Sequence, residues 1–321
     1  ESSAYISSMK AMVMQFARHK GLVIGISTAA FGVSGTLFAL VYTQIFGRDD
    51  DFLKQDLSNY ALFMLITHMV AYTLCVIFVN SRAKPGPEQG KSKRIPLLAA
   101  LKQWDYWILC ILFIPSMSAV VSLVYNIAYI TISMHGSGDL SVKLIAYLTA
   151  LLPAFNGLGR VAIGLTYHHY QDREHAWWVL AQMVLITVVQ TILLFGLKQV
   201  WTLFVSVILT GLAYGSSYTL VPILVSSWFG AEHFGFNLGI LFIGTSFGFV
   251  GVQELAGYLY QSNIDEGDDI NTCYGEKCWV ATFGIFLITL LIACWFALLL
   301  AIRRTKSKRR TEMMETAVLN P

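Results

Sequence analysis

Charge is scarce in this sequence. Asp, Glu, Lys and Arg make up 13% of its 321 residues and hydrophobic residues 56%, whereas soluble domains carry about 25% charge. An ordinary soluble domain is therefore excluded. The net charge of +3 is small, and the basic residues form short clusters beside apolar runs, which argues against a nucleic-acid partner. We expect an integral membrane protein.

The sequence also lacks the motifs of catalysis and of cofactor binding. It has no metal-ligand spacing, nucleophile elbow or phosphate loop. Its apolar runs hold no carboxylate pair or histidine cluster at helical spacing. We therefore expect that the protein is not an enzyme and that it binds neither a cofactor nor a metal ion. The chain starts at Glu1 without a methionine or a signal peptide, so we expect that an N-terminal part is missing.

Cysteines are few, with five in the chain. Cys75, Cys110 and Cys294 fall inside apolar runs, where a cysteine usually serves as a small buried hydrophobe. Cys273 and Cys278 instead share a polar loop. They are candidates for a disulfide if that loop faces an oxidising compartment, and otherwise they stay reduced.

Long apolar runs dominate what remains. Each is long enough for a helix to cross a hydrocarbon layer of about 30 Å, and in lipid only helices or closed barrels satisfy the backbone. The sequence thus predicts an all-α polytopic bundle of eight transmembrane helices. The predicted spans are 21–46, 60–79, 106–133, 144–167, 177–197, 201–228, 234–260 and 279–302.

Basic residues predict the topology. An even number of spans places both termini on one side, and most of the 22 lysines and arginines fall on that side, which is therefore predicted to be cytoplasmic. The pattern does not distinguish a plasma membrane from a vacuolar membrane. Segment 81–104 is rich in Pro, Gly and Lys and is predicted to be a cytoplasmic linker. Segment 303–310, RRTKSKRR, is expected to anchor the chain at anionic membrane lipid, with a specific lipid site as the alternative.

Glycines recur in every third span, the first, the fourth and the seventh. Glycine lets helices come close or slide past each other. We expect a moving helix interface, and static packing is the alternative. The candidate interface glycines are Gly25, Gly32, Gly35, Gly164, Gly239, Gly244 and Gly248.

Polar side chains follow one face of the third span and one face of the sixth, at spacings of three and four residues. Helices with a polar face are expected to line a water-filled cavity, although hydrogen bonds between helices are the alternative. Alternating glycine-rich and polar-faced helices is the pattern that a transporter built from three-helix inverted repeats needs. The candidate substrate-cavity residues are Ser118, Ser122, Tyr125, Asn126, Tyr129, Tyr214 and Ser217.

Three ionisable residues lie well inside spans. Arg160 costs about 2.5–3.5 kcal/mol near the bilayer centre, so it must face protein or water. Glu254 is either a proton carrier or an interfacial carboxylate that reaches water. His68 either titrates during transport or stays as a neutral, hydrogen-bonded ring.

Several short motifs carry a resemblance to a family. Residues 18–25, RHKGLVIG, with FGVSG at 31–35, resemble the entry into the fifth helix of major facilitator transporters of the monocarboxylate-transporter and nodulin-like groups. Residues 211–235 resemble the tenth helix of fungal monocarboxylate-permease-like members. WDYW at 104–107, with Tyr125 and Asn126, is similar to the seventh helix.

The resemblance implies that the spans correspond to helices five to twelve of a twelve-helix fold. Residues 1–80 would then be the remnant of an N-terminal bundle with two spans, 81–104 the central linker, 105–302 a C-terminal six-helix bundle and 303–321 a cytoplasmic tail. The implied function is secondary or facilitative transport of a small organic solute, with a monocarboxylate and protons as expected partners, as in a symporter. The alternative is a non-transporting membrane receptor or scaffold, or an inactive fragment of a transporter.

In monocarboxylate transporters an arginine on the eighth helix, four residues after an aspartate, works in substrate and proton coupling. Arg160 with Gly164 resembles that pattern, but Asn156 stands in the aspartate's place. A neutral amide does not relay protons, so the resemblance leaves proton coupling through this pair open. Arg160 and Asn156 are therefore coupling or gating candidates.

Overall fold

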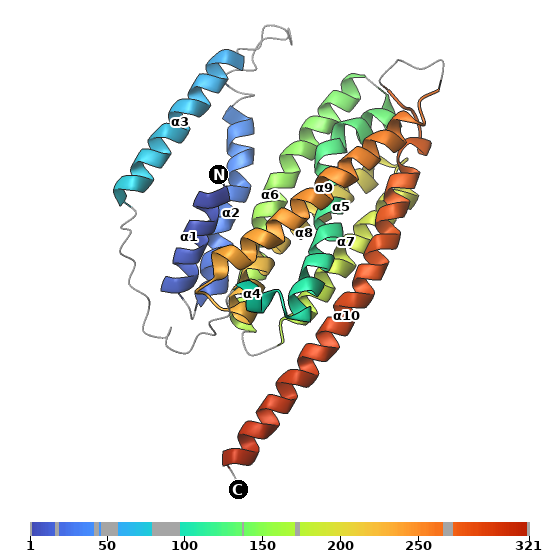
Figure 1. Ribbon diagram of the computed structural model, residues 1–321. Helices are drawn as coiled ribbons and strands as arrows, with labels where there is room; N and C mark the ends of the chain where they lie inside the picture. Colours follow the sequence, from blue (N-terminus) through green and yellow to red (C-terminus); the bar gives the residue numbers. More distant parts are fainter. Residues whose placement is uncertain are drawn as a thin grey trace.

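The computed structural model describes residues 2–16, 19–41, 45, 57–78, 97–136, 138–170, 174–265 and 272–319 (Figure 1). No strand occurs in these ranges, and the predicted all-α class is confirmed. The helices are α1 (Ser2–Gln15), α2 (Lys20–Val41), α3 (Leu57–Phe78), α4 (Leu97–Ala100), α5 (Trp104–His135), α6 (Asp139–His169), α7 (Ala176–Gly196), α8 (Val200–Phe229), α9 (Phe234–Gln261) and α10 (Lys277–Leu319).

Seven helices of the described residues are long and apolar enough to cross a membrane: α2 and the six from α5 to α10. The second predicted span, 60–79, coincides with α3, which is helical over 22 residues but is not among the seven. The count of eight spans thus stays a prediction. Most of the predicted linker, at 81–96, lies outside the described residues.

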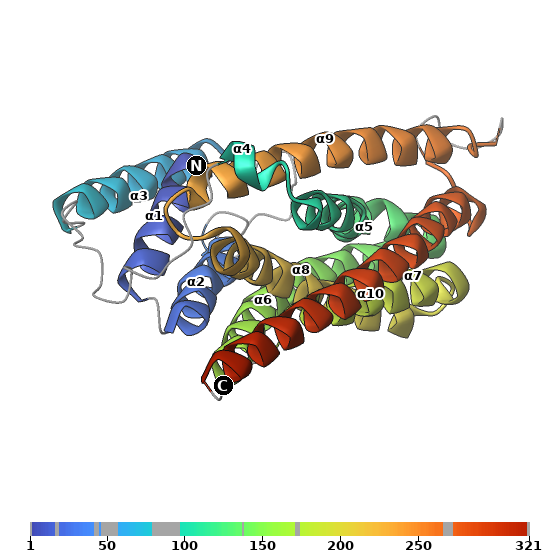
Figure 2. The same cartoon turned by 60° about the horizontal axis from the view of Figure 1, so that its bottom comes forward.

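α6 lies at the centre of the helix packing. It packs against α8 and against α2, and these two contacts are the most extensive between described helices. α5 packs against α9 and α10, and α7 against α10 and α8. α1 contacts both α2 and α9, and α3 stands at the edge beside α2 (Figures 1 and 2).

The hairpin of α8 and α9 turns at Gly230. Its φ of 87° lies in the left-handed region, which favours glycine. Phe229 and Phe234, on either side of the turn, are fully buried. The hydroxyl of Tyr106 donates to the carbonyl oxygen of Asn237 at 2.7 Å, and its ring lies 5.3 Å from that of Phe229. The start of α5 thereby fixes the hairpin.

α10 differs from the predicted last span. The prediction ends the span at residue 302 and begins a tail at 303, whereas the helix continues to Leu319 (Figure 1). Lysine and arginine are good helix formers, and no glycine or proline interrupts residues 303–319. The basic segment is therefore helical. The assignment of residues 303–321 to the cytoplasm stays a prediction.

Candidate functional site

α2 and α6 meet through glycine. A Cβ atom on Gly25 would lie 2.8 Å from the carbonyl oxygen of Arg160, and one on Gly164 would lie 2.7 Å from that of Gly21. At Gly32 it would lie 2.9 Å from Oδ1 of Asn156 and 3.1 Å from the backbone nitrogen of Gly157. Gly35 has more room, since its nearest neighbour is Pro153 at 3.7 Å. Three of the candidate glycines on α2 and α6 thus stand at direct backbone contacts.

α6 and α8 also meet through glycine, at positions that the sequence analysis does not single out. A Cβ atom on Gly159 would collide with the carbonyl oxygen of Leu212, and one on Gly215 with that of Asn156. One on Gly211 would lie 2.8 Å from the carbonyl oxygen of Leu152. The spacing of four between Gly211 and Gly215 is a signal for close packing, but the same span also carries a polar face, which predicts a cavity instead.

The candidate glycines of α9 behave differently. A Cβ atom on Gly248 would collide with the side chain of Ile114, and at Gly244 the nearest atom is 3.9 Å away, in Ile114 as well. At Gly239 no atom of the described residues lies within 4 Å. The expectation of a close helix interface therefore does not apply to Gly239 or Gly244 here, because α9 presents these glycines away from neighbouring backbone.

Arg160 is buried between α6, α2 and α8, with 2% of its surface exposed. Its Nε donates to Oδ1 of Asn156 at 2.7 Å, and its guanidinium carbon lies 5.5 Å from the centre of the Tyr218 ring, a cation–π distance. Asn156 is 4% exposed. The two residues one helical turn apart thus form one buried group, which faces α8.

A hydroxyl contact connects α2 to α8 beside this group. Oγ1 of Thr28 lies 3.2 Å from Oγ1 of Thr219, and both side chains are buried. Thr219 follows Tyr218 directly. This contact joins the two helices that pack against α6.

The seven candidate cavity residues do not surround one chamber. On α5, Ser118 and Ser122 are buried, whereas Tyr125 and Tyr129 are 68% and 54% exposed. Nδ2 of Asn126 donates to the carbonyl oxygen of Ser122 at 2.8 Å and to Oε1 of Gln253, on α9, at 3.0 Å. This polar face of α5 runs from the interior of the bundle to its surface.

On α8, the candidate Ser217 faces α7 instead. Nε2 of Gln182 donates to Oγ of Ser217 at 2.7 Å and to the carbonyl oxygen of Ala213 at 2.6 Å, and Oγ of Ser216 donates to Oε1 of Gln182 at 2.6 Å. Tyr214 is partly buried, with its ring 5.0 Å from that of Tyr218. For Ser217 the alternative reading, a hydrogen bond between helices, describes the structure.

A polar pocket of about 660 Å³ lies where α5, α9 and α10 meet. Its volume falls in the range of roughly 300–1,000 Å³ that small-molecule sites occupy. Two candidate cavity residues line it together with residues that the sequence analysis does not name. The lining includes Asn126, Tyr129, Tyr260, Gln261 and Trp279.

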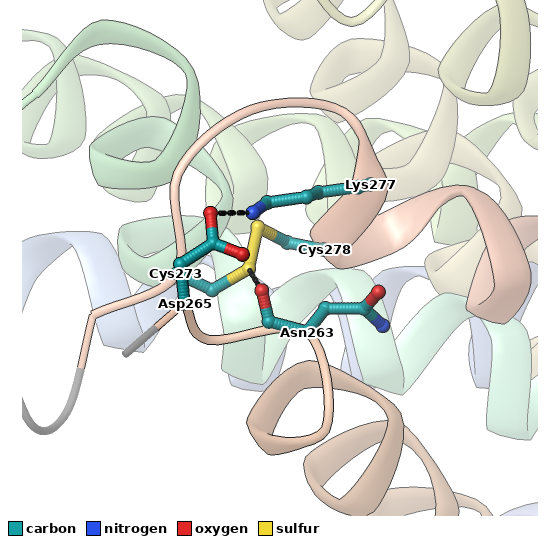
Figure 3. A network of polar contacts seen from close by, with 5 residues as sticks. All are labelled: Asn263, Asp265, Cys273, Lys277 and Cys278. Atoms are coloured by element: carbon teal, nitrogen blue, oxygen red, sulfur yellow. Dashed lines mark hydrogen bonds and ion pairs between the residues drawn. A yellow bond between two sulfur atoms is a disulfide. The ribbon is translucent and has the colours of Figure 1, made fainter. Parts of the chain in front are cut away.

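A disulfide-closed loop adjoins this pocket. Cys273 and Cys278 are bonded to each other, and the sulfur of Cys273 lies 3.2 Å from the carbonyl oxygen of Asn263 (Figure 3). The backbone N–H of Cys273 donates to the hydroxyl of Tyr260 at 2.9 Å. Lys277 forms an ion pair with Asp265. The loop therefore holds in place one of the residues that line the pocket, Tyr260.

The loop is also attached to α5. The backbone N–H of Gly275 donates to the carbonyl oxygen of Ser133 at 2.9 Å, and Nε1 of Trp279 donates to Oγ of Ser133 at 3.2 Å. The Trp279 ring lies 5.2 Å from that of Tyr260. The pocket is thus framed by contacts that the cystine loop makes with two helices.

Glu254 and His68, the other two coupling candidates, lie elsewhere. Glu254 is exposed on α9. His68 is on α3, where its Nδ1 lies 2.7 Å from the carbonyl oxygen of Met64 and its ring stacks on Phe38 at 6.2 Å. The structure therefore brings Arg160 and Asn156 together but adds neither of these two residues to them.

A polar cluster that the sequence analysis does not single out lies at the opposite end of the bundle from the cystine loop. Nζ of Lys20 donates to Oγ of Ser227 at 2.8 Å, and the hydroxyl of Tyr167 lies 3.1 Å from the same oxygen. The Tyr167 ring lies 4.5 Å from that of His175. Burial, together with Lys20 and Lys308, lowers the pKa of His175 to about 4. His175 is thus neutral at physiological pH.

The described residues hold no group of three or more His, Cys, Asp or Glu side chains able to bind a metal ion.

Residues 171–319, which include α7 to α10, match the family model of the Major Facilitator Superfamily. The match covers a little under half of the chain and is a similarity to the major facilitator superfamily. This similarity and the apolar helices together support an integral membrane protein.

The chain is also similar to curated proteins that are named as transporters. The chain is 22% identical over 265 residues to the uncharacterized MFS-type transporter YhjX of Escherichia coli, covering 77% of this chain and 60% of that protein. It is 22% identical over 261 residues to MFS transporter asaE of Aspergillus flavus, covering 79% and 54%. It is 32% identical over 108 residues to the probable transporter mch1 of Aspergillus fumigatus, covering 33% and 17%. The chain thus spans at most 60% of the length of these relatives.

Proposed function

We propose that this protein is a secondary or facilitative transporter that moves a small organic solute across a membrane by alternating access. The observation that carries the proposal is the packing of α6 between α2 and α8 through glycine, with Arg160 buried at the crossing. Bare backbone contacts let helices shift against each other with few side chains to repack. The match to the Major Facilitator Superfamily model and the relatives named as transporters support a transporter rather than an enzyme.

In the proposed domain organisation, the contact between α2 and α6 joins two different bundles. We infer that residues 1–80 belong to an N-terminal bundle with two spans, 81–104 to a linker, 105–302 to a C-terminal bundle and 303–321 to a cytoplasmic tail. α2 then lies before the linker and α6 after it. Their glycine contact would be the seam at which one bundle moves on the other.

For the solute, we propose a small monocarboxylate of the kind handled by the monocarboxylate-transporter and nodulin-like groups. A buried guanidinium binds carboxylates well, because its N–H groups match both oxygens. Arg160 has this chemistry beside two tyrosines, Tyr214 and Tyr218. Asn156 does not titrate, so a proton symporter would need another carrier, and facilitative transport is the simpler form of the proposal.

Uptake by the longest natural form of the protein that contains this chain, in sealed vesicles, tests the function. We expect accumulation of a labelled small monocarboxylate and its loss in Arg160→Ala. The matched control is Lys143→Ala, which removes an exposed cation from the same helix. Normal uptake by Arg160→Ala would refute the assigned role. A folded protein that transports no solute would favour a receptor or scaffold.

Comparing uptake with and without a pH gradient tests coupling to protons. Equal uptake with and without the gradient favours facilitative transport, whereas faster uptake with the gradient favours a symporter.

For the topology, we propose that both termini are cytoplasmic. A disulfide at Cys273 and Cys278 is consistent with this orientation, because disulfides persist in oxidising compartments. Protease added outside intact cells tests it: the segment 303–319 should survive. Cleavage of that segment without breaking the cells would reverse the assignment.

A further inference from the structure

A groove of about 340 Å³ runs between the start of α5 and the last turns of the apolar part of α10. It lies away from both the Arg160 group and the polar pocket. Its lining is apolar except at one rim, where a single arginine stands. The residues that matter here are Trp104, Trp107, Ile111, Phe296, Leu299 and Arg303.

The apolar floor of the groove is open. Ile111 is 53% exposed and Leu299 is 44% exposed, so hydrocarbon can lie directly against both helices. Trp107 is held in place because its Nε1 donates to the carbonyl oxygen of Leu101 at 2.8 Å. Trp104 is 72% exposed at the end of the groove. Exposed tryptophan marks the level of lipid headgroups, so the groove passes from hydrocarbon into the headgroup layer.

The rim of the groove carries an exposed cation. Nε of Arg304 lies 3.3 Å from Oδ2 of Asp105, whereas Nε of Arg303 lies 3.8 Å from its Oδ1. Glu174 is a second acid that interacts electrostatically with Arg304. Arg304 also stacks over the Trp228 ring at 4.0 Å. Arg304 is therefore the arginine that the acids hold more closely. The side chain of Arg303 remains 58% exposed at the groove.

α10 extends the positive charge beyond the groove. Because the helix continues past residue 303, side chains three and seven positions later share the face of Arg303. Lys306 and Arg310 occupy these positions. Figure 1 shows this part of α10 projecting beyond the other helices.

We propose that the groove between α5 and α10 binds an anionic phospholipid of the surrounding bilayer. One acyl chain lies on the seam between Ile111 and Leu299, and the phosphate meets Arg303 at the rim, beside Trp104. Charge complementarity selects the occupant, since an apolar channel that ends at a cation in the headgroup layer fits a negatively charged lipid. The proposal does not depend on transport.

Lipid retention measures this directly. The full chain, purified in mild detergent, is mixed with phosphatidylglycerol or with phosphatidylcholine of the same acyl chains, and bound lipid is counted by native mass spectrometry. We expect phosphatidylglycerol to be retained in preference. Arg303→Gln should lower its retention roughly fivefold, the effect of one basic residue beside an anionic headgroup. Arg309→Gln, with the same charge change outside the groove, should leave retention unchanged.

Two further arms make the result decisive. Ile111→Trp places a larger ring on the floor of the groove and should lower retention with Arg303 intact. Glycerol phosphate, which has the headgroup charge but no acyl chains, should not compete. Equal losses in Arg303→Gln and Arg309→Gln, unchanged retention in Ile111→Trp, equal binding of both lipids or competition by glycerol phosphate would each overturn the proposal.

Discussion

Arg160 and Asn156 lie one turn apart on α6, and the guanidinium Nε donates to the amide oxygen at 2.7 Å. The turn that joins them presses against Gly215, whose missing side chain leaves room for the carbonyl oxygen of Asn156. A buried cation, the amide that orients it and the glycine that admits their backbone therefore form one unit. Changes to each member should have different effects.

Asn156→Ala removes a hydrogen-bond acceptor from a buried guanidinium. Leaving such a donor unsatisfied costs about 1–3 kcal/mol, and we expect the stability of the protein in detergent to fall by that amount. Thermal unfolding measures it. Thr149→Ala is the control, because its exposed hydroxyl bonds only to its own helix. Equal stability of the two variants would contradict the structural role of Asn156.

Asn156→Asp should behave in the opposite way. The carboxylate keeps the acceptor oxygen near Nε of Arg160 and converts the contact into a charge-assisted bond. We expect stability equal to or above that of the parent chain. If the transport proposal holds, uptake should become more sensitive to a pH gradient, because the new group can carry a proton. A variant that is less stable than Asn156→Ala would argue against this geometry.

Two glycine substitutions should have opposite effects. In Gly215→Ala the added methyl group meets the carbonyl oxygen of Asn156, so α6 and α8 must separate, and overpacking of this kind costs about 1–3 kcal/mol. Gly251→Ala on α9 meets no atom within 4 Å among the described residues. It should be neutral or stabilising by up to about 1 kcal/mol, since alanine favours helix. Thermal unfolding of both variants measures these effects. A Gly215→Ala variant as stable as the parent chain would refute the close contact.

The sequence predicts the helices well, because long apolar runs can be satisfied in lipid in few ways. It also predicts interface positions at Gly25, Gly32 and Gly164, which lie at close contacts between α2 and α6. The sequence does not tell which residue each glycine contacts. Gly215 stands in a polar-faced helix and still makes one of the closest backbone contacts.

The polar faces show where sequence reasoning stops. Spacing places Ser217 on the same stripe as Tyr214, but it does not reveal whether that stripe faces water or another helix. Gln182, two turns into a different apolar helix, decides the matter by bonding to Ser217. Nothing in the sequence around Gln182 marks it as the partner, so only the packing of α7 on α8 identifies the network.

His175 should make stability depend on pH. Its pKa is lowered from 6.5 to about 4 in the folded chain, first by burial and then by Lys20 and Lys308, and its ring packs on Tyr167. Between these values the unfolded chain binds more protons, so stability should fall as the pH falls from about 6.5 to 4. His175→Gln should reduce that slope in thermal unfolding, and His169→Gln, an exposed control, should not. Identical pH profiles for all three chains would contradict the assignment.

The cystine loop should stabilise the pocket beside it. The disulfide closes a short loop, with a sequence separation of 5, and constraining the unfolded chain over such a loop is worth roughly 2 kcal/mol. The variant with Cys273→Ser and Cys278→Ser should therefore unfold at a lower temperature than the parent chain. The opened loop should also hold Tyr260 less firmly, because the backbone N–H of residue 273 that bonds to its hydroxyl is no longer fixed by the disulfide. Reductant should lower the unfolding temperature of the parent chain but leave that of the double variant unchanged, because the other two cysteines whose side chains the structure describes, Cys110 and Cys294, carry free thiols. If reductant leaves the unfolding temperature of the parent chain unchanged, the loop is held by Lys277, Asp265 and Ser133 rather than by the disulfide.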